Sequence, residues 1–159
     1  MSKTIVVYFS ASGVTMQVAE RLATSIRANI YEIKPAVPYT NADLNWMNKQ
    51  SRSSIEMQDH NSRPEILEDG FSFDEFDTIF LGFPIWWYVA PTIVNTFLEK
   101  HDFSNKKIIV FATSGGSTLG GTVEKLKKSV SDSTNLVEGA VLKPDVSIDE
   151  LKAFAEKYI

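Results

Sequence analysis

Residues 5–20 read IVVYFSASGVTMQVAE, and this stretch decides the fold. The apolar run 5–9 is typical of a β-strand that is buried on both faces. A short polar loop occupies residues 10–15, and apolar residues then recur at helical spacing from residue 14 to residue 26. The stretch therefore predicts a strand, a tight loop and a helix in direct succession.

The same alternation continues along the chain. Further apolar strands are predicted at residues 30–33, 78–83, 108–112 and 136–142, and helices after Pro91, at residues 122–130 and after the capping box SIDE at residues 147–150. Strands that alternate with helices predict an α/β fold, a doubly wound five-stranded parallel sheet with helices on both faces. We expect residues 1–159 to form a single domain.

A long connection interrupts this pattern at about residues 35–76. It is rich in polar residues, and such long connections in small domains are often functional lids. Its stretch NADLNWMNKQSRSSIEM, residues 41–57, predicts one helix with Asn41 as the candidate cap. Arg52 and Arg63 are candidates for contacts with a substrate or with the phosphate of a second cofactor, and solvent-exposed arginines are the commoner alternative.

Composition excludes several classes of protein. The chain has 16 basic and 20 acidic residues, a formal net charge of −4, which disfavours nucleic acid or an anionic membrane as a partner. It has no cysteine, so disulfides, thiolate metal sites and cysteine nucleophiles are ruled out. No apolar run has the length of a membrane span or a secretory signal. We therefore expect a cytoplasmic protein.

Three loops follow predicted strands and should meet at one edge of the sheet, where ligands bind in doubly wound folds. The first, SASGVT at residues 10–15, offers hydroxyl groups and the amides at the start of a helix. It lacks the Gly-Lys-Ser/Thr ending of a nucleotide-hydrolysing loop. The loop suits a phosphate monoester held by neutral donors, and a plain capped helix is the alternative.

The other two loops suit a flat ligand. Residues 82–91, GFPIWWYVAP, place Trp86 and Trp87 at a rim that should be exposed to solvent. Large aromatic side chains there indicate stacking against a ligand or cover for the core, and we expect one tryptophan in each role. Residues 113–121, TSGGSTLGG, allow close backbone approach to a planar edge.

Together these loops resemble the flavin mononucleotide (FMN) site of the flavodoxin family, over nearly the whole chain. SASGVT is similar to that family's phosphate loop, with Ser12 in place of the more usual threonine. The resemblance implies the strand order 2-1-3-4-5 and FMN as the cofactor. It implies that the phosphate is bound by Ser10, Ala11, Ser12, Gly13, Val14 and Thr15, and that the ring is bound by Pro84, Ile85, Trp86, Trp87, Thr113, Ser114, Gly115 and Gly116.

Two functions stay open at this point. One is an oxidoreductase that passes electrons from NAD(P)H to a small acceptor such as a quinone. The other is an electron carrier between redox partner proteins, with no substrate of its own. The third loop has no acidic residue and no aromatic residue, and the ring loop has no glycine after Gly82, which favours the enzyme. The catalytic residues are not assigned, and no metal site is expected.

Overall fold

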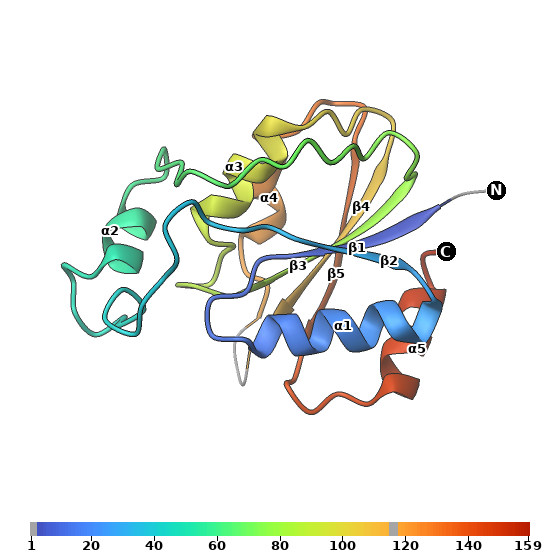
Figure 1. Ribbon diagram of the computed structural model, residues 1–159, viewed down its shortest axis with the longest axis horizontal. Coiled ribbons are helices and arrows are strands. Elements are labelled where there is room, and N and C mark those ends of the chain that lie inside the picture. Colours follow the sequence, from blue (N-terminus) through green and yellow to red (C-terminus); the bar gives the residue numbers. More distant parts are fainter. Residues whose placement is uncertain (1–2, 115–117) are drawn as a thin grey trace.

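A computed structural model of the chain describes residues 3–114 and 118–159. Its centre is a five-stranded sheet in which all neighbouring strands pair in parallel, in the order β2-β1-β3-β4-β5 (Figure 1). The strands are β1 (Thr4–Tyr8), β2 (Asn29–Glu32), β3 (Thr78–Pro84), β4 (Lys107–Thr113) and β5 (Asn135–Leu142). The predicted fold class and strand order are confirmed.

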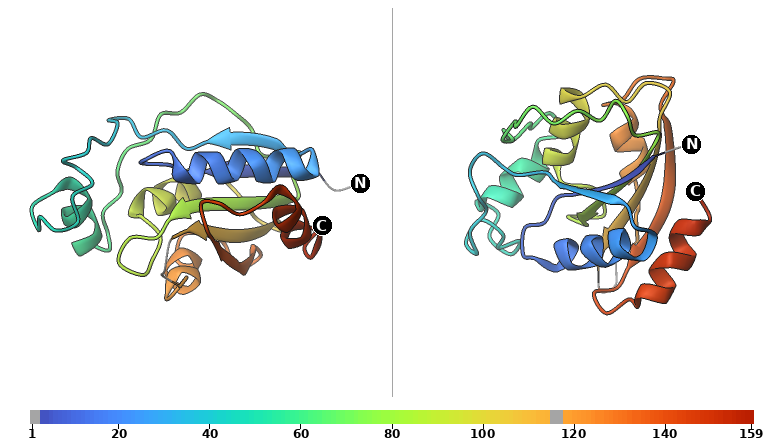
Figure 2. Two further views of the ribbon diagram at one scale, coloured as in Figure 1. Left: turned by 90° about the horizontal axis from the view of Figure 1, so that it is seen from below. Right: turned by 45° about the vertical axis from the view of Figure 1, so that its right-hand side comes forward.

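Helices cover both faces of the sheet. Helices α1 (Val14–Ile26) and α5 (Ile148–Glu156) lie on one face, and α3 (Thr92–Lys100) and α4 (Thr122–Lys127) lie on the other (Figure 1). Helix α2 (Arg52–Gln58) belongs to the long connection and lies beyond one end of the sheet (Figure 2). The connection therefore extends past the sheet at α2 and returns to the core at Phe73, whose ring packs on Phe97 of α3.

Burial on both faces explains the continuous apolar strands. Along β1, Ile5 and Val7 pack under α3 and α4, while Val6 and Tyr8 pack under α1 and α5. Successive side chains of a strand point to opposite faces, so both sets must be apolar. Gly82 in β3 has its own packing reason, because a Cβ there would lie 2.2 Å from the Phe111 ring.

The helix predicted over residues 41–57 is wrong in its first part. Residues 41–51 form turns, and α2 begins at Arg52 with Ser51 as its cap, whose side chain accepts from the Ser54 amide. Thr40 and Asp43 each accept the other's backbone amide with a side-chain oxygen, at 3.1 and 2.9 Å. Such local bonds compete with helical hydrogen bonds, which explains the later start.

The predicted end of α4 differs from the structure, whereas the predicted start of α5 agrees with it. Helix α4 ends at Lys127, earlier than the predicted residue 130. The capping box before α5 is present, because the Ser147 hydroxyl accepts the Glu150 amide at 3.1 Å and lies 3.2 Å from the Glu150 carboxylate. The predicted cap of α5 by the Ser147 side chain is therefore confirmed.

Candidate functional site

The three predicted loops meet at the carboxyl edge of the sheet. The hydroxyl groups of Thr15 and Thr113 are 2.8 Å apart and buried, which joins the first loop to the third. The Ile85 amide donates to the Thr113 carbonyl at 3.5 Å, which joins the second loop to the third. The three loops thus lie together at one edge of the sheet, as predicted.

Ser10 organises the first loop. Its hydroxyl oxygen accepts the amides of Gly13 at 3.0 Å and Met16 at 3.2 Å, which caps the start of α1. Gly13 has a φ of 93°, a conformation that glycine adopts without steric cost. In the described part of the chain the Ser10 hydroxyl hydrogen has no acceptor, so this donor is available to a ligand.

Backbone donors surround this hydroxyl. Among the residues that the structure describes, no acceptor is bound by the amides of Ala11, Ser12, Val14 and Thr15. The first turn of α1 carries no acidic side chain. Free amides at a helix start attract an anion, since the helix dipole places partial positive charge there.

A small cavity of about 280 Å³ adjoins this loop. Ser10 and Ala11 form one wall, and Lys34 and Tyr39 form part of another. Lys34 and Glu32 bring one charge of each sign to the neighbourhood of a loop that has none of its own. The sequence pattern did not single out Lys34, which lies at this edge because it comes just after β2 in the parallel sheet.

The second loop separates its two tryptophans. Trp86 packs edge-on against Phe9 and Tyr39, with ring centroids 5.9 and 5.6 Å apart, and so covers the core. Trp87 is 45% exposed, and Ile85 is half-buried beside the core. One tryptophan therefore has the structural role that was expected, and the other is free to contact a ligand.

A strained turn directs Trp87 outward. Trp86 and Val89 exchange amide-to-carbonyl hydrogen bonds at 3.0 and 3.2 Å, and Trp87 and Tyr88 between them have φ values of 50° and 66°. Positive φ at both central residues marks a type I′ turn, which normally holds asparagine or glycine. Bulky residues in this region cost roughly 1–2 kcal/mol each, and such strain concentrates at functional sites.

The third loop packs under this turn. A Cβ at Gly120 would lie 2.4 Å from the Tyr88 carbonyl oxygen, so only glycine allows this approach. The Ser114 amide donates to the Leu142 carbonyl at 3.3 Å. The predicted ring contacts Gly115 and Gly116 lie outside the described residues.

The long connection is tied to this region by the Tyr39 ring, which contacts Phe9 and Trp86 and on which Arg52 packs. The Arg52 guanidinium carbon lies 3.8 Å from the centre of the Tyr39 ring, and its Nε is 3.0 Å from Glu56. The Tyr39 hydroxyl donates to Glu56 at 2.5 Å, and burial followed by this carboxylate raises the pKa of Tyr39. Arg52 thus holds the connection together, which leaves little of its charge for a ligand.

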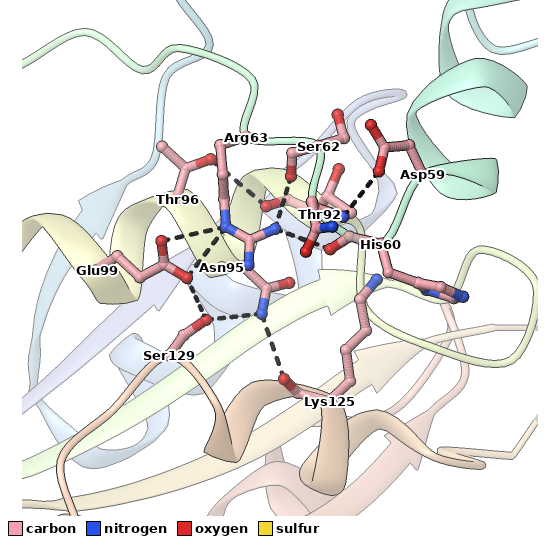
Figure 3. A network of polar contacts seen from close by, with 11 residues as sticks. Asp59, His60, Ser62, Arg63, Thr92, Asn95, Thr96, Glu99, Lys125 and Ser129 are labelled. Atoms are coloured by element: carbon pink, nitrogen blue, oxygen red, sulfur yellow. Dashed lines mark hydrogen bonds and ion pairs between the residues drawn. The ribbon is translucent and has the colours of Figure 1, made fainter.

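Arg63 attaches the other end of the connection to α3. Its Nε lies 3.0 Å from a Glu99 carboxylate oxygen, and Nη1 donates to the carbonyls of His60 and Ser62 at 3.0 and 2.8 Å (Figure 3). Ser129 donates to Glu99 at 2.7 Å. Like Arg52, Arg63 therefore uses its guanidinium group for contacts within the protein.

Lys125 lies beside the same network. Its Nζ donates to the Ala90 carbonyl at 2.7 Å, which fixes the end of the second loop to α4. Burial, and to a smaller extent Arg63, lowers the pKa of Lys125 to about 8. The buried oxygens Thr92 Oγ1 and Asn95 Oδ1 have no hydrogen-bond partner among the described residues (Figure 3 shows these side chains).

A larger cavity of about 920 Å³ lies between the connection and the second loop. Its wall includes Trp46, Met47, Met57, His60 and Trp87. Trp46 is 69% exposed and Met47 is 75% exposed. The sequence signalled this cavity only through scattered aromatic and methionine residues in a polar segment, and it did not show that they would share a cavity wall with Trp87.

Within residues 3–114 and 118–159, no group of three or more histidine or acidic side chains could hold a metal ion. No helix in those residues has the length and apolar character needed to cross a bilayer.

Comparisons with known proteins agree with this geometry. A family model described as flavodoxin matches residues 3–158. Two solved structures of proteins assigned as flavoproteins, from Bacteroides eggerthii and Bacteroides uniformis, are each 43% identical with a TM-score of 0.90; they cover 99% and 98% of this chain, and 98% of each of those chains is covered. A flavoprotein from Lactobacillus acidophilus in complex with FMN shares the fold at 23% identity, a TM-score of 0.67, and 95% and 99% coverage. No match was found among curated proteins. The chain belongs to the flavodoxin family.

Proposed function

We propose that the protein is an FMN-dependent oxidoreductase that passes electrons from NAD(P)H to a small acceptor such as a quinone, in the cytoplasm. The observation that carries the proposal is the cavity of about 920 Å³ beside Trp87. Its volume is in the range of small-molecule sites. A cavity of this size beside the residue that is expected to contact the flavin ring can hold a small acceptor next to that ring.

FMN is the cofactor that membership of the flavodoxin family supplies, and the residues at the sheet edge fit it. The unpaired amides of Ala11, Ser12, Val14 and Thr15 and the free Ser10 hydrogen provide donors for a phosphate. Trp87 presents an aromatic side chain that is 45% exposed. Donors and aromatic surface thus lie where the phosphate and the ring are expected.

When bound, FMN supplies the chemistry of accepting two electrons from NAD(P)H and passing them to an acceptor. The balanced reaction is NAD(P)H plus a proton plus a quinone giving NAD(P)⁺ plus the hydroquinone. The chain's own part is to hold the phosphate at the start of α1, to support the ring with the second loop, and to keep an acceptor beside Trp87.

Anaerobic stopped-flow mixing tests the proposal. The FMN-loaded protein is mixed with NADH or NADPH, and the flavin absorbance near 450 nm should bleach within about a second and return when a quinone is added. Bleaching that takes many minutes with both nucleotides would contradict the proposal.

An electron carrier between redox partner proteins is the second candidate. The family assignment over residues 3–158 supports it, because the flavodoxin family includes electron carriers between redox proteins. This candidate predicts slow reduction by NAD(P)H and fast reduction by a flavoprotein reductase in the same apparatus. The two rates, compared on one preparation, separate the candidates.

A further inference from the structure

We propose that the cavity between the connection and the second loop is a binding site for a fused-ring aromatic acceptor that carries an anionic group. This inference rests on the proposed function, because it names the class of acceptor. It also makes a separate claim about binding, which can be measured without any turnover.

The apolar part of the site consists of side chains that would otherwise be costly to expose. Trp46, Met47 and Trp87 are 69%, 75% and 45% exposed and belong to the wall of one cavity. Indole rings and thioether groups make favourable contacts with flat aromatic molecules. A cavity of about 920 Å³ has room for two or three fused rings.

The charge in the wall of the site is positive. Lys49 is part of the wall, and among the described residues no carboxylate is, although the chain has 20 acidic residues. Asp59 precedes the wall residue His60 without being part of the wall, and its Oδ1 accepts the Asn61 amide at 3.0 Å, which holds this carboxylate within its own loop. The charge of the wall is therefore complementary to an anion, in a protein whose net charge of −4 repels anions generally.

Several contacts hold the wall in place before a ligand arrives. Arg63 donates to the His60 carbonyl and forms an ion pair with Glu99 on α3 (Figure 3). The Gln58 side-chain amide donates to the Lys49 carbonyl at 3.3 Å, which ties the lysine segment to the end of α2. The turn at Trp87 completes the site. Preorganisation of this kind reduces the entropy cost of binding.

The test uses two redox-inert probes of nearly equal shape, naphthalene-2-sulfonate and the uncharged naphthalene-2-sulfonamide. Each is titrated into the oxidised, FMN-loaded protein, with loading checked by visible absorbance and binding followed by calorimetry. The sulfonate should bind about three- to tenfold more tightly than the sulfonamide. Equal affinities, or no binding of the sulfonate, would overturn the proposal.

Variants locate the effect. Lys49→Gln should remove most of the preference for the sulfonate and leave sulfonamide binding unchanged, while Trp46→Ala should weaken both probes about tenfold. Lys152→Gln, an exposed lysine of α5 on the other side of the sheet, is the matched control and should change neither. A preference that survives Lys49→Gln would overturn the proposed charge recognition.

The two proposals fail in different ways. Binding of the sulfonate without oxidation of NAD(P)H would contradict the proposed oxidoreductase and support the site. Rapid quinone reduction by a protein that does not distinguish the two probes would support the oxidoreductase and contradict the site.

Discussion

Ser10 shows how one hydroxyl group can serve both folding and binding. Its oxygen accepts the amides of Gly13 and Met16, and its hydrogen is left for a ligand. Thr15 is in a comparable position, because in its pair with Thr113 only one hydroxyl donates to the other. The second hydroxyl hydrogen of that pair can be donated elsewhere.

Ser10→Ala should weaken FMN binding more than riboflavin binding, because we propose that the removed hydroxyl donates to the phosphate, which riboflavin lacks. The extra loss should be about 1.5–3 kcal/mol, roughly ten- to a hundredfold in Kd. Fluorescence titration of the apoprotein with both flavins measures it. Equal losses for the two ligands would place the phosphate elsewhere.

His101 provides a pH-dependent test of packing. Its ring is half-buried among the rings of Phe73, Phe97 and Phe103, and burial lowers its pKa despite the opposing effect of Glu68 and Asp69. An NMR titration should place the His101 pKa below the ordinary value of about 6.5. A measured pKa at or above that value would contradict this packing.

The lowered pKa of His101 also makes the free energy of unfolding depend on pH. The unfolded chain binds the proton at a higher pH than the folded chain, so the contribution of His101 is fully present above about pH 6.5 and is lost as pH falls below it. Urea unfolding at pH 7.5 and 5.5 should therefore show a smaller acid-induced loss for His101→Phe than for the natural protein.

At the scale of elements, the turn at Trp87 and Tyr88 controls the backbone beside the proposed flavin ring. Both residues already have positive φ. Rotating the peptide between them would give a type II′ turn, whose first central position is suited to glycine alone. Trp87 therefore opposes a change of this peptide during reduction.

Photoreduction of the FMN-loaded protein tests this constraint. The natural protein should pass between its oxidised and fully reduced spectra with little absorbance beyond 550 nm, because one-electron reduction is not helped by a peptide rotation. Trp87→Gly should increase that absorbance, and Trp87→Ala should not, since alanine removes the ring without easing the rotation. Similar behaviour of the two variants would contradict the role given to the backbone.

At the scale of the whole molecule, the connection combines buried aromatic residues, Phe73 and Phe76, with polar contacts to the helices. Arg63 joins it to Glu99 on α3, and Glu99 is joined in turn to Ser129 after α4. Both partners of the ion pair are partly exposed, so the pair stabilises the protein only modestly. Its larger effect should be on where the connection lies.

Arg63→Gln should loosen residues 59–63 without unfolding the domain. Amide hydrogen exchange there should rise about fivefold, while the free energy of global unfolding should fall by less than about 1 kcal/mol. Lys3→Gln, which removes the exposed ion pair with Glu75, is the control and should leave exchange in the connection unchanged. Unchanged exchange in Arg63→Gln would show that other contacts hold the segment.

The sequence by itself determined the sheet, its helices and the loop at residues 10–15. These features depend on local patterns: apolar runs for strands buried on both faces, helical spacing, and a hydroxyl next to a helix start. The same patterns placed Trp86 and Trp87 at the rim. They could not say which of the two would cover the core.

The tertiary structure decided what the connection does. The pairing of Arg63 with Glu99, the contact between Gly120 and Tyr88, and the presence of Trp46 and Trp87 in the wall of one cavity all involve residues far apart in the chain. Hydrogen bonds between Thr40 and Asp43 also overrode a helical pattern that looked continuous. Such contacts have no periodic signature, because they depend on where a chain folds back and on which side chains it then meets.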